Sequence, residues 1–115
     1  PNSQDGIYLR RDKNSILGNQ IGSSLPNMGN GGDGLHLHTS NNNLIGGTYF
    51  NEIDANGRNG DFIDGDGNLL QGNLISENDE AGVYVQGGDN LIGGACCGGN
   101  LIFSYGGNGV LLNGV

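Results

Sequence analysis

The sequence is poor in residue types on which several functional classes depend. It has no tryptophan, two prolines and two cysteines, and four lysines and arginines stand against twelve aspartates and glutamates, giving a net charge of -8 over 115 residues. A nucleic-acid-binding surface needs clustered basic residues, so we expect no nucleic-acid partner. A membrane-spanning helix needs about twenty consecutive apolar residues. Apolar runs here stop at three or four residues, so we expect no membrane insertion.

The two cysteines are adjacent, Cys96 and Cys97, within the stretch GGACCGG. They are too few for a disulfide framework, and their spacing does not fit a zinc site. Three interpretations stay open: unpaired loop thiols, covalent cross-links to a neighbouring chain, and a strained disulfide within the pair. The cross-link would require an oxidising, extracellular location.

Glycine and asparagine are abundant instead. The chain contains 25 glycines and 18 asparagines, and both residue types favour turns and disfavour helix interiors. This composition excludes a helical bundle. Only 34% of the residues are apolar, so the core must be narrow. The apolar residues nevertheless recur in a fixed order, which argues against disorder.

A repeated pattern accounts for that order. Five segments of alternating apolar residues begin at Gly6, Gly34, Gly60, Gly82 and Gly109, which are 28, 26, 22 and 27 residues apart. Two Asn-x-(Ile/Leu) units follow each of the first four. Period-two alternation predicts strands, and three short strands per repeat predict a solenoid. We therefore predict an all-β fold: a parallel β-helix of about four to five coils, with uncapped ends, in one domain over residues 1–115.

Stacked coils place like residues above one another, because paired strands lie about 4.8 Å apart. Four inward aliphatic columns follow. Their members are Ile7, Leu35, Val83 and Val110; Leu9, Leu37, Ile63, Val85 and Leu112; Ile16, Ile45, Leu70 and Ile92; and Ile21, Ile53, Ile75 and Ile102. Asp61 interrupts the first column, and one explanation is a local bulge that turns Phe62 inward.

The asparagines that open the Asn-x-(Ile/Leu) units form two further columns. These are Asn14, Asn43, Asn68 and Asn90, and Asn19, Asn51, Asn73 and Asn100. Stacked asparagines pass amide hydrogen bonds along the axis and tolerate the left-handed backbone of a sharp corner. We expect an asparagine ladder in each column; the alternative is that these residues only form turns. Length differences between coils should lie in corner insertions such as Asp54–Asn59.

The strings NSILGNQIG, NGGDGLHL, NNNLIGGT, GNLLQGNLIS and DNLIGG resemble the right-handed parallel β-helix repeats of large secreted prokaryotic surface proteins. The resemblance covers residues 5–115 and extends to the pectate-lyase-like superfamily. It implies a right-handed β-helix that is secreted or displayed on a cell surface. It implies little about activity, since the superfamily includes lyases, hydrolases, esterases, phage tailspikes, adhesins and structural repeats.

The outward-facing residues of the first strand of each coil form a column on the surface, which we call the aromatic column. Its members are Tyr8, His36, Phe62, Tyr84 and Leu111. Such a line of rings fits an interface with another subunit, ordinary cross-strand stacking or a sugar-stacking surface. A similar exposed line on the second strands contains Leu44, Leu69 and Leu91.

The stretch GDFIDGDGN gathers acidic residues in the third coil. Asp64, Asp66 and Asn68 resemble the oxygen-rich start of a calcium loop, although the glutamate that completes such a loop is absent. Calcium is therefore a candidate cofactor, beside a plain turn and a pair of catalytic aspartates. His36 and His38 share a strand face, but the columns offer no third metal ligand. We assign no catalytic residue, because no basic residue faces these acids.

The sequence shows no capping pattern at either end, so we expect open end coils with unpaired backbone groups. Copies of the chain would then join head to tail. The contacts would come from the aromatic column and from Ile7, Leu9, Val110 and Leu112. We predict an extracellular structural subunit that assembles into a filament or surface layer. The alternatives are a carbohydrate-binding or polysaccharide-degrading module and a passive spacer of a giant adhesin.

Overall fold

The computed structural model of the chain describes residues 2–25, 28–94, 99–104 and 106–113. Within these residues every strand pairs in parallel, and the strands form three sheets. The first sheet contains β1 (Ile7–Leu9), β4 (Leu35–His38), β7 (Asp61–Asp64), β10 (Val83–Val85) and β13 (Val110–Leu112). The second contains β2 (Ser15–Ile16), β5 (Leu44–Gly46), β8 (Leu69–Gln71) and β11 (Leu91–Ile92). The third contains β3 (Gln20–Ile21), β6 (Glu52–Asp54), β9 (Leu74–Asn78) and β12 (Leu101–Ser104).

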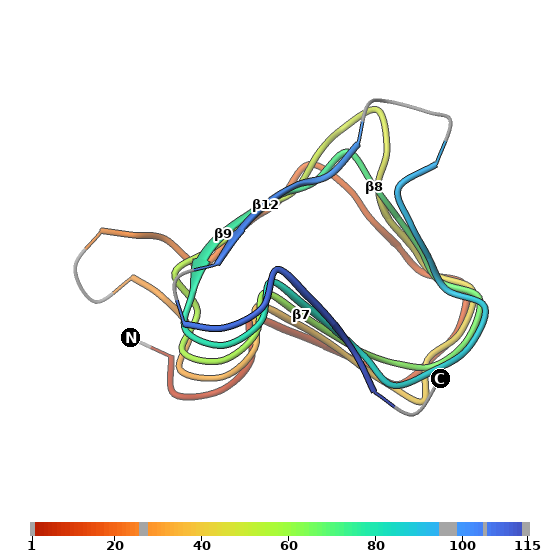
Figure 1. Cartoon of the computed structure of the whole chain (residues 1–115), viewed down its shortest axis with the longest axis horizontal. Coiled ribbons are helices and arrows are strands. Elements are labelled where there is room, and N and C mark those ends of the chain that lie inside the picture. Colours follow the sequence, from red (N-terminus) through yellow and green to blue (C-terminus); the bar gives the residue numbers. More distant parts are fainter. Residues whose placement is uncertain (1, 26–27, 95–98, 105, 114–115) are drawn as a thin grey trace.

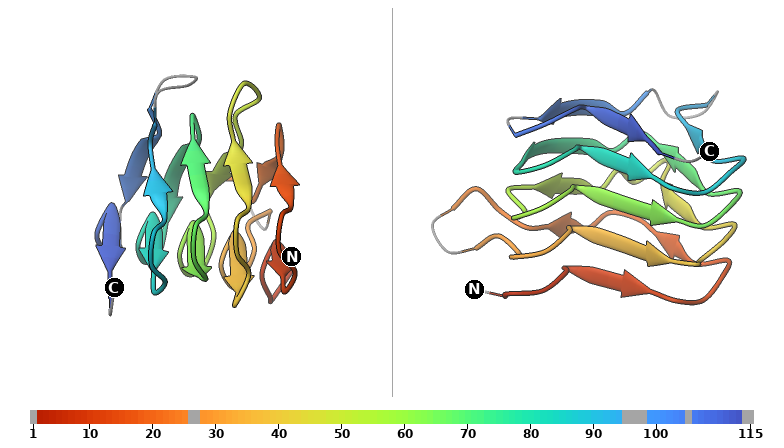
Figure 2. Two further views of the ribbon diagram at one scale, coloured as in Figure 1. Left: turned by 90° about the vertical axis from the view of Figure 1, so that its right-hand side faces the viewer. Right: turned by 60° about the horizontal axis from the view of Figure 1, so that its bottom comes forward.

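The chain visits the three sheets in turn and then starts the next coil. Figure 1 shows the coils superposed around a three-sided path, with β7, β8 and β9 on different sides. Figure 2 shows the same coils as stacked rungs, with the two termini at opposite ends of the stack. The fold is a parallel β-solenoid of about four turns, and it contains no helix among the described residues. The predicted fold class is thereby confirmed.

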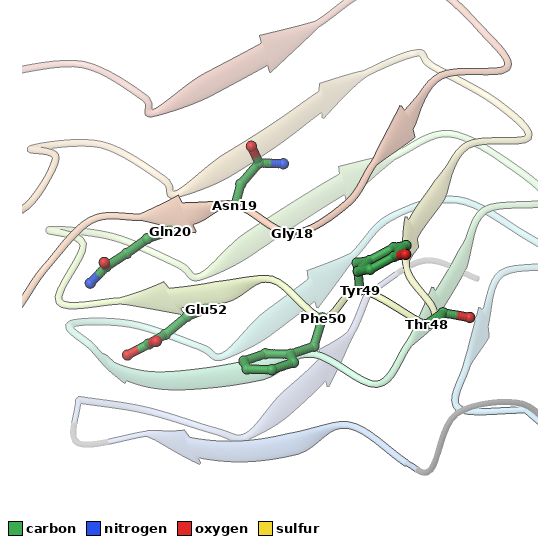
Figure 3. A pocket seen from close by; sticks show the side chains of 7 residues that line it. All are labelled: Gly18, Asn19, Gln20, Thr48, Tyr49, Phe50 and Glu52. Carbon is green, nitrogen blue, oxygen red and sulfur yellow. The ribbon is translucent and has the colours of Figure 1, made fainter.

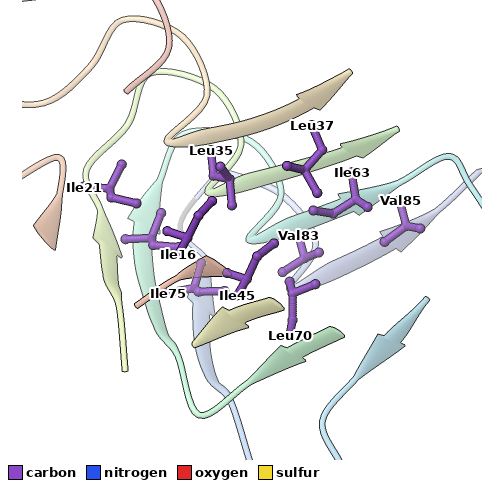
Figure 4. Close-up of a cluster of buried hydrophobic side chains, with 11 residues drawn as sticks. Ile16, Ile21, Leu35, Leu37, Ile45, Ile63, Leu70, Ile75, Val83 and Val85 are labelled. Atoms are coloured by element: carbon purple, nitrogen blue, oxygen red, sulfur yellow. The ribbon is translucent and has the colours of Figure 1, made fainter. Parts of the chain in front are cut away.

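The predicted inward columns are the core. Leu35 pairs with Ile7 on one side, and Ile53 pairs with Ile21 and Ile75. Figure 4 shows the buried side chains converging from the three sheets into one narrow interior. Alternate residues of each strand point inward, so three strands of two to five residues enclose a core that none could form alone.

The bulge expected around Asp61 is not present, and that expectation was wrong. Asp61 pairs in unbroken register with Leu35 and Val83, and its side chain is 0% exposed. Phe62 points outward and stacks on Tyr84, with ring centroids 5.1 Å apart. Hydrogen bonding on both edges of β7 keeps the strand regular even though a carboxyl group then takes an inward position.

Both predicted asparagine ladders are present. The backbone N–H and the side-chain Nδ2 of Asn43 both donate to Oδ1 of Asn68, over 2.9 and 2.8 Å. In the other ladder, Nδ2 of Asn73 donates to Oδ1 of Asn100 over 3.0 Å and to the Ile45 carbonyl over 2.9 Å. From the second coil on, each side chain of these two ladders thus accepts from a corner N–H that the strand pairing leaves without a partner.

A third ladder lies at the remaining corner, where the sequence predicted only insertions. Nδ2 of Asn30 donates to Oδ1 of Asn56, and Nδ2 of Asn56 donates to Oδ1 of Asn78, each over 2.9 Å. Asn56 is buried, so Asp54–Asn59 is a structural corner and not a loose insertion. All three corners are therefore held by hydrogen bonds between stacked asparagine amides.

The repeated glycine is required by close packing at this third corner. A Cβ placed on Gly34 would lie 2.6 Å from Asn56 Nδ2, 2.6 Å from Ile53 Cγ2 and 2.7 Å from the Gly60 carbonyl oxygen. Contacts below 3 Å to backbone and ladder atoms leave no space for a methyl group. The glycines before the first four strands of the first sheet thus let the next coil approach to strand-pairing distance.

Replacing Asn73 by alanine tests the contribution of a buried ladder amide. The change leaves the N–H and Nδ2 of Asn51 without their shared acceptor and should lower the free energy of unfolding by on the order of 1–3 kcal/mol, as measured by denaturant titration. Asn108→Ala is the control, because the exposed Asn108 side chain makes no hydrogen bond within the described residues. Equal stability of the two variants would contradict the role assigned to the ladder.

Candidate functional site

The aromatic column on the outer face of the first sheet is a continuous run of ring contacts. Ring centroids of Tyr8 and His36 are 4.8 Å apart, and those of His36 and Phe62 are also 4.8 Å apart. Tyr84 continues the stack beyond Phe62 in a nearly parallel arrangement. These contacts agree with the cross-strand stacking interpretation, and the subunit-interface and sugar-stacking interpretations stay predictions. The stack also fixes the plane and position of the His36 ring between two aromatic neighbours.

Two aspartates meet the His36 ring at the corner where the first sheet begins. His36 Nδ1 lies 3.0 Å from Asp5 Oδ2 and 3.7 Å from Asp33 Oδ2. The three donor atoms all lie within 4.8 Å of one another. Asp33 is 1% exposed, and its Oδ2 atom has no hydrogen-bond partner. We call Asp5, Asp33 and His36 the corner cluster.

A ladder of carboxylates holds the corner cluster in place. Asp5 Oδ1 accepts a hydrogen bond from the Asp33 N–H over 2.7 Å. Asp33 Oδ1 accepts from both the N–H and Nδ2 of Asn59, each over 2.9 Å. One oxygen of each carboxylate is thus used by the corner backbone, and the other oxygen faces His36.

This cluster was not predicted from the sequence, because the strand columns contain no third ligand to accompany His36. The aspartates lie outside the strands, one residue before the repeated glycines Gly6 and Gly34. The signal was present: the position before the repeat glycine is Asp, Asp and Asn in the first three coils. Asp33 at this position lies beside His36 of the following strand, and Asp5 reaches the same ring from the preceding coil.

Asp61 is a second buried acid near this corner. Both of its carboxyl oxygens are buried without a hydrogen-bond partner. Burial, together with the nearby negative charge of Asp33, raises the pKa of the Asp61 carboxyl to about 8 from the usual 3.8. The protonated form is neutral and is therefore the form that suits its place in an aliphatic column.

The residues proposed for calcium lie apart from the corner cluster, and two of their side-chain oxygens accept hydrogen bonds within the fold. Asp66 Oδ1 accepts from the Gly88 N–H, and Asn68 Oδ1 accepts from Asn43. Asp64 Oδ2 lies 3.9 Å from Nδ1 of His38 on the outer face. His38 is thus beside an acid of the next coil, and its ring centroid lies 6.1 Å from that of His36. Among the described residues, the donor cluster with Asp5 and Asp33 contains His36 and not His38. Calcium binding by Asp64, Asp66 and Asn68 stays a prediction.

A surface groove of about 370 Å³ lies on the side of the solenoid where the chain leaves the second sheet for the third. Figure 3 shows the rings of Tyr49 and Phe50 beside Glu52, with Asn19 and Gln20 from the preceding coil. Tyr49 is 67% exposed and Phe50 is 56% exposed, so two aromatic side chains are offered to solvent next to amide and carboxyl groups.

A second groove, of about 510 Å³, adjoins the corner cluster. It is lined by Asp5, Tyr8 and Arg58, together with the glycine pair Gly31 and Gly32. The groove connects the Asp5 side of the cluster with solvent.

The rungs at the two ends of the stack expose the residues proposed for self-association. Val110 and Leu112 on β13 are 42% and 60% exposed, whereas their partners Val83 and Val85 are buried. Ile7 and Leu9 on β1 are half-buried. Within the described residues, β1 and β13 each pair on one edge only. Cys96 and Cys97, proposed for cross-linking, lie outside the described residues.

Comparisons with models of known families, with curated proteins and with solved structures found no match for this chain. The described residues also form no helix of the length and apolarity that crossing a membrane requires.

Replacing Asp61 by leucine, a side chain of similar shape, tests the cost of the buried acid. The variant should unfold with a free energy higher by on the order of 1–3 kcal/mol, because an unpartnered polar group leaves an aliphatic column. The raised pKa means that the folded chain retains a proton that the unfolded chain releases, so parent stability falls as the pH rises from about 4 to about 8. The gain of the variant should widen over the same interval.

Asp64→Leu is the matched control for this measurement. Asp64 lies on the same strand, on the outer face, and its removal should change the free energy of unfolding by less than about 0.5 kcal/mol. A destabilised Asp61→Leu variant, or a gain that is the same at pH 4 and pH 8, would contradict the assignment.

Proposed function

We propose that this chain is an extracellular structural subunit of the right-handed, pectate-lyase-like β-helix type, which joins further copies end to end into a filament or surface layer. The observation that carries the proposal is the pair of end rungs, whose sheet edges and apolar residues have no cover within the described residues. Unpaired strand edges are templates for pairing with another chain.

The direction of the asparagine ladders supports a head-to-tail contact. In both predicted ladders the earlier coil donates and the later coil accepts. Within the described residues, Oδ1 of Asn14 and of Asn19 therefore accepts nothing, and the N–H of Asn90 and of Asn100 donates nothing. A head-to-tail contact turns these donor ends toward these acceptor ends. Because β13 adds a rung that only the first sheet has, a junction of β13 with β1 leaves the space of one rung between the ladder ends. A head-to-head contact would place acceptors against acceptors.

Apolar residues complement the hydrogen bonds. Val110 and Leu112 of one copy would stack on Ile7 and Leu9 of the next copy and so continue the inward columns. Within the chain, the same two residues already stack on Val83 and Val85. The aromatic column would continue across the junction through Leu111 and Tyr8. One contact repeated without closure gives a polar filament. Oxidation of Cys96 and Cys97 would add covalent cross-links in an extracellular setting.

The double variant Val110→Lys/Leu112→Lys tests the end contact. Two charges at inward positions of the last rung should block stacking, because a lysine in the core column of a junction would be buried without a partner. In sedimentation velocity, the parent should form species that grow with concentration, and the double variant should stay monomeric.

The control is Tyr49→Lys/Phe50→Lys, which removes two exposed apolar side chains and adds the same charge on the side of the solenoid. It should assemble like the parent. A parent that stays monomeric at high concentration, or a double variant that assembles equally well, would contradict end-to-end association.

A second candidate function is the binding of a neutral glycan, which the groove at Tyr49 and Phe50 favours. Exposed aromatic rings offer faces for stacking, and Gln20 and Glu52 offer hydrogen-bonding groups to hydroxyls. The net charge of -8 disfavours acidic polysaccharides, so the candidate ligand is an uncharged oligosaccharide.

Calorimetric titration with cellohexaose tests this candidate. Binding by the parent should be lost in Tyr49→Ala/Phe50→Ala, because both ring faces are removed. Leu25→Ala removes an equally exposed apolar side chain that does not line the groove, and it should bind like the parent. If the parent does not bind cellohexaose, or if the double variant still binds it, a neutral glycan is not the ligand of this groove.

A further inference from the structure

The geometry points to a metal-binding site at the corner cluster, where Asp5, Asp33 and His36 would hold a divalent transition-metal ion of the zinc type. This site is independent of end-to-end assembly. It is built from two consecutive coils, so the ion would also join the first coil to the second.

The donor set is of a kind that zinc accepts. His36 Nδ1, Asp5 Oδ2 and Asp33 Oδ2 are one nitrogen and two oxygens, and imidazole with carboxylates suits zinc and its neighbours in the first transition row. Calcium fits poorly, because it takes six to eight oxygen ligands. A nitrogen and two carboxylate oxygens meet neither that number nor that preference.

Two of the three donor spacings are close to those of a coordination sphere, and the third lies within 4.8 Å. Donor atoms bound at about 2.0–2.1 Å to a tetrahedral ion lie about 3.4 Å from one another. The distances from His36 Nδ1 to the two carboxylate oxygens are 3.0 and 3.7 Å, on either side of that value. Small side-chain rotations would bring the three donors around one ion, and a further position would be left for water.

An ion pair between His36 and Asp5 does not explain the position of the Asp33 carboxylate. The hydrogen bond of His36 Nδ1 goes to Asp5, so Asp33 Oδ2 stays buried, unpartnered and directed at the same nitrogen. Burial of an unpaired carboxylate oxygen is unfavourable. A bound cation would satisfy this atom together with Asp5.

Hydrogen bonds behind the donors hold them in the orientation that metal binding needs. The Asp33 N–H holds Asp5 Oδ1, and Asn59 holds Asp33 Oδ1 through two hydrogen bonds. The His36 ring is fixed between Tyr8 and Phe62. Such outer contacts orient ligands and raise metal affinity. The groove lined by Asp5, Tyr8 and Arg58 supplies a route for an ion from solvent.

Zinc chloride titration of the full chain carrying Cys96→Ser and Cys97→Ser tests the site without competition from the thiols. Calorimetry should detect one saturable site, and zinc should raise the melting temperature, since the ion binds the folded state. Cobalt(II) should give visible absorption bands typical of nitrogen and oxygen ligands.

Two variants in the same background remove donors while keeping the fold. His36→Phe keeps a ring in the aromatic column, and Asp33→Asn keeps Oδ1 as the acceptor for Asn59. Each should weaken zinc binding by at least about tenfold and abolish the zinc-dependent rise in melting temperature. His38→Gln is the matched control, because it removes a histidine beside Asp64 on the same strand, and it should bind zinc like its parent.

The metal-free melting temperatures of the variants report whether the fold is retained. Absence of saturable zinc binding by the Cys96→Ser/Cys97→Ser chain would overturn the proposal. So would equal zinc affinity of a folded Asp33→Asn or His36→Phe variant, and so would a loss of binding in His38→Gln that matches the loss in His36→Phe.

Discussion

The fold depends on hydrogen bonds at buried corners. A coil as short as 22 residues must turn sharply three times, and each turn leaves backbone N–H groups that the parallel sheets do not pair. The asparagine Oδ1 atoms accept from these groups, for example from the N–H of Asn43 and of Asn73. Without them every additional coil would bury further unsatisfied donors, and stacking would become less favourable with each turn.

The corner hydrogen bonds also explain why so few apolar residues are enough to form the core. Apart from Asp61, the interior holds one aliphatic side chain per column and coil, such as Ile53 between Ile21 and Ile75. The glycines before the first four strands of the first sheet bring neighbouring coils into contact at Asn56 and its equivalents. Ladder amides thus fill the corners that a wider core would fill with aliphatic residues, which is why buried asparagines are among the largest enclosed side chains.

The sequence predicted the strands, the aliphatic columns and two ladders, because those features share a fixed spacing. Asn43, Asn68 and Asn73 are each followed two residues later by an inward aliphatic residue, which sets their register. Asn30 and Asn56 lack such a neighbour and lie in corners of variable length, so no local pattern aligned them. The regular strand around Asp61 also could not be predicted, because hydrogen bonds from two neighbouring strands overrule the local preference for burying Phe62. The corner cluster joins a strand residue to residues before two glycines, and that contact arises only when coils stack.

Aspartate in place of asparagine changes what a ladder position can do. An asparagine has one acceptor oxygen, and its Nδ2 donates to a neighbouring coil, as Asn59 donates to Asp33. One oxygen of an aspartate still accepts a hydrogen bond from the corner N–H. The second oxygen has no N–H group of the ladder to bond with, because an aspartate has no Nδ2 group and its neighbour's donors are already used. When aspartates occupy two consecutive coils, as Asp5 and Asp33 do, their second oxygens lie within 4.8 Å of each other. Two like charges at that separation repel each other, and the repulsion is relieved by a cationic partner. Single substitutions of asparagine by aspartate can therefore give a β-solenoid a charged site at a corner while its backbone hydrogen bonds stay unchanged. The residue in the neighbouring column of outward rings, here His36, then supplies the third ligand.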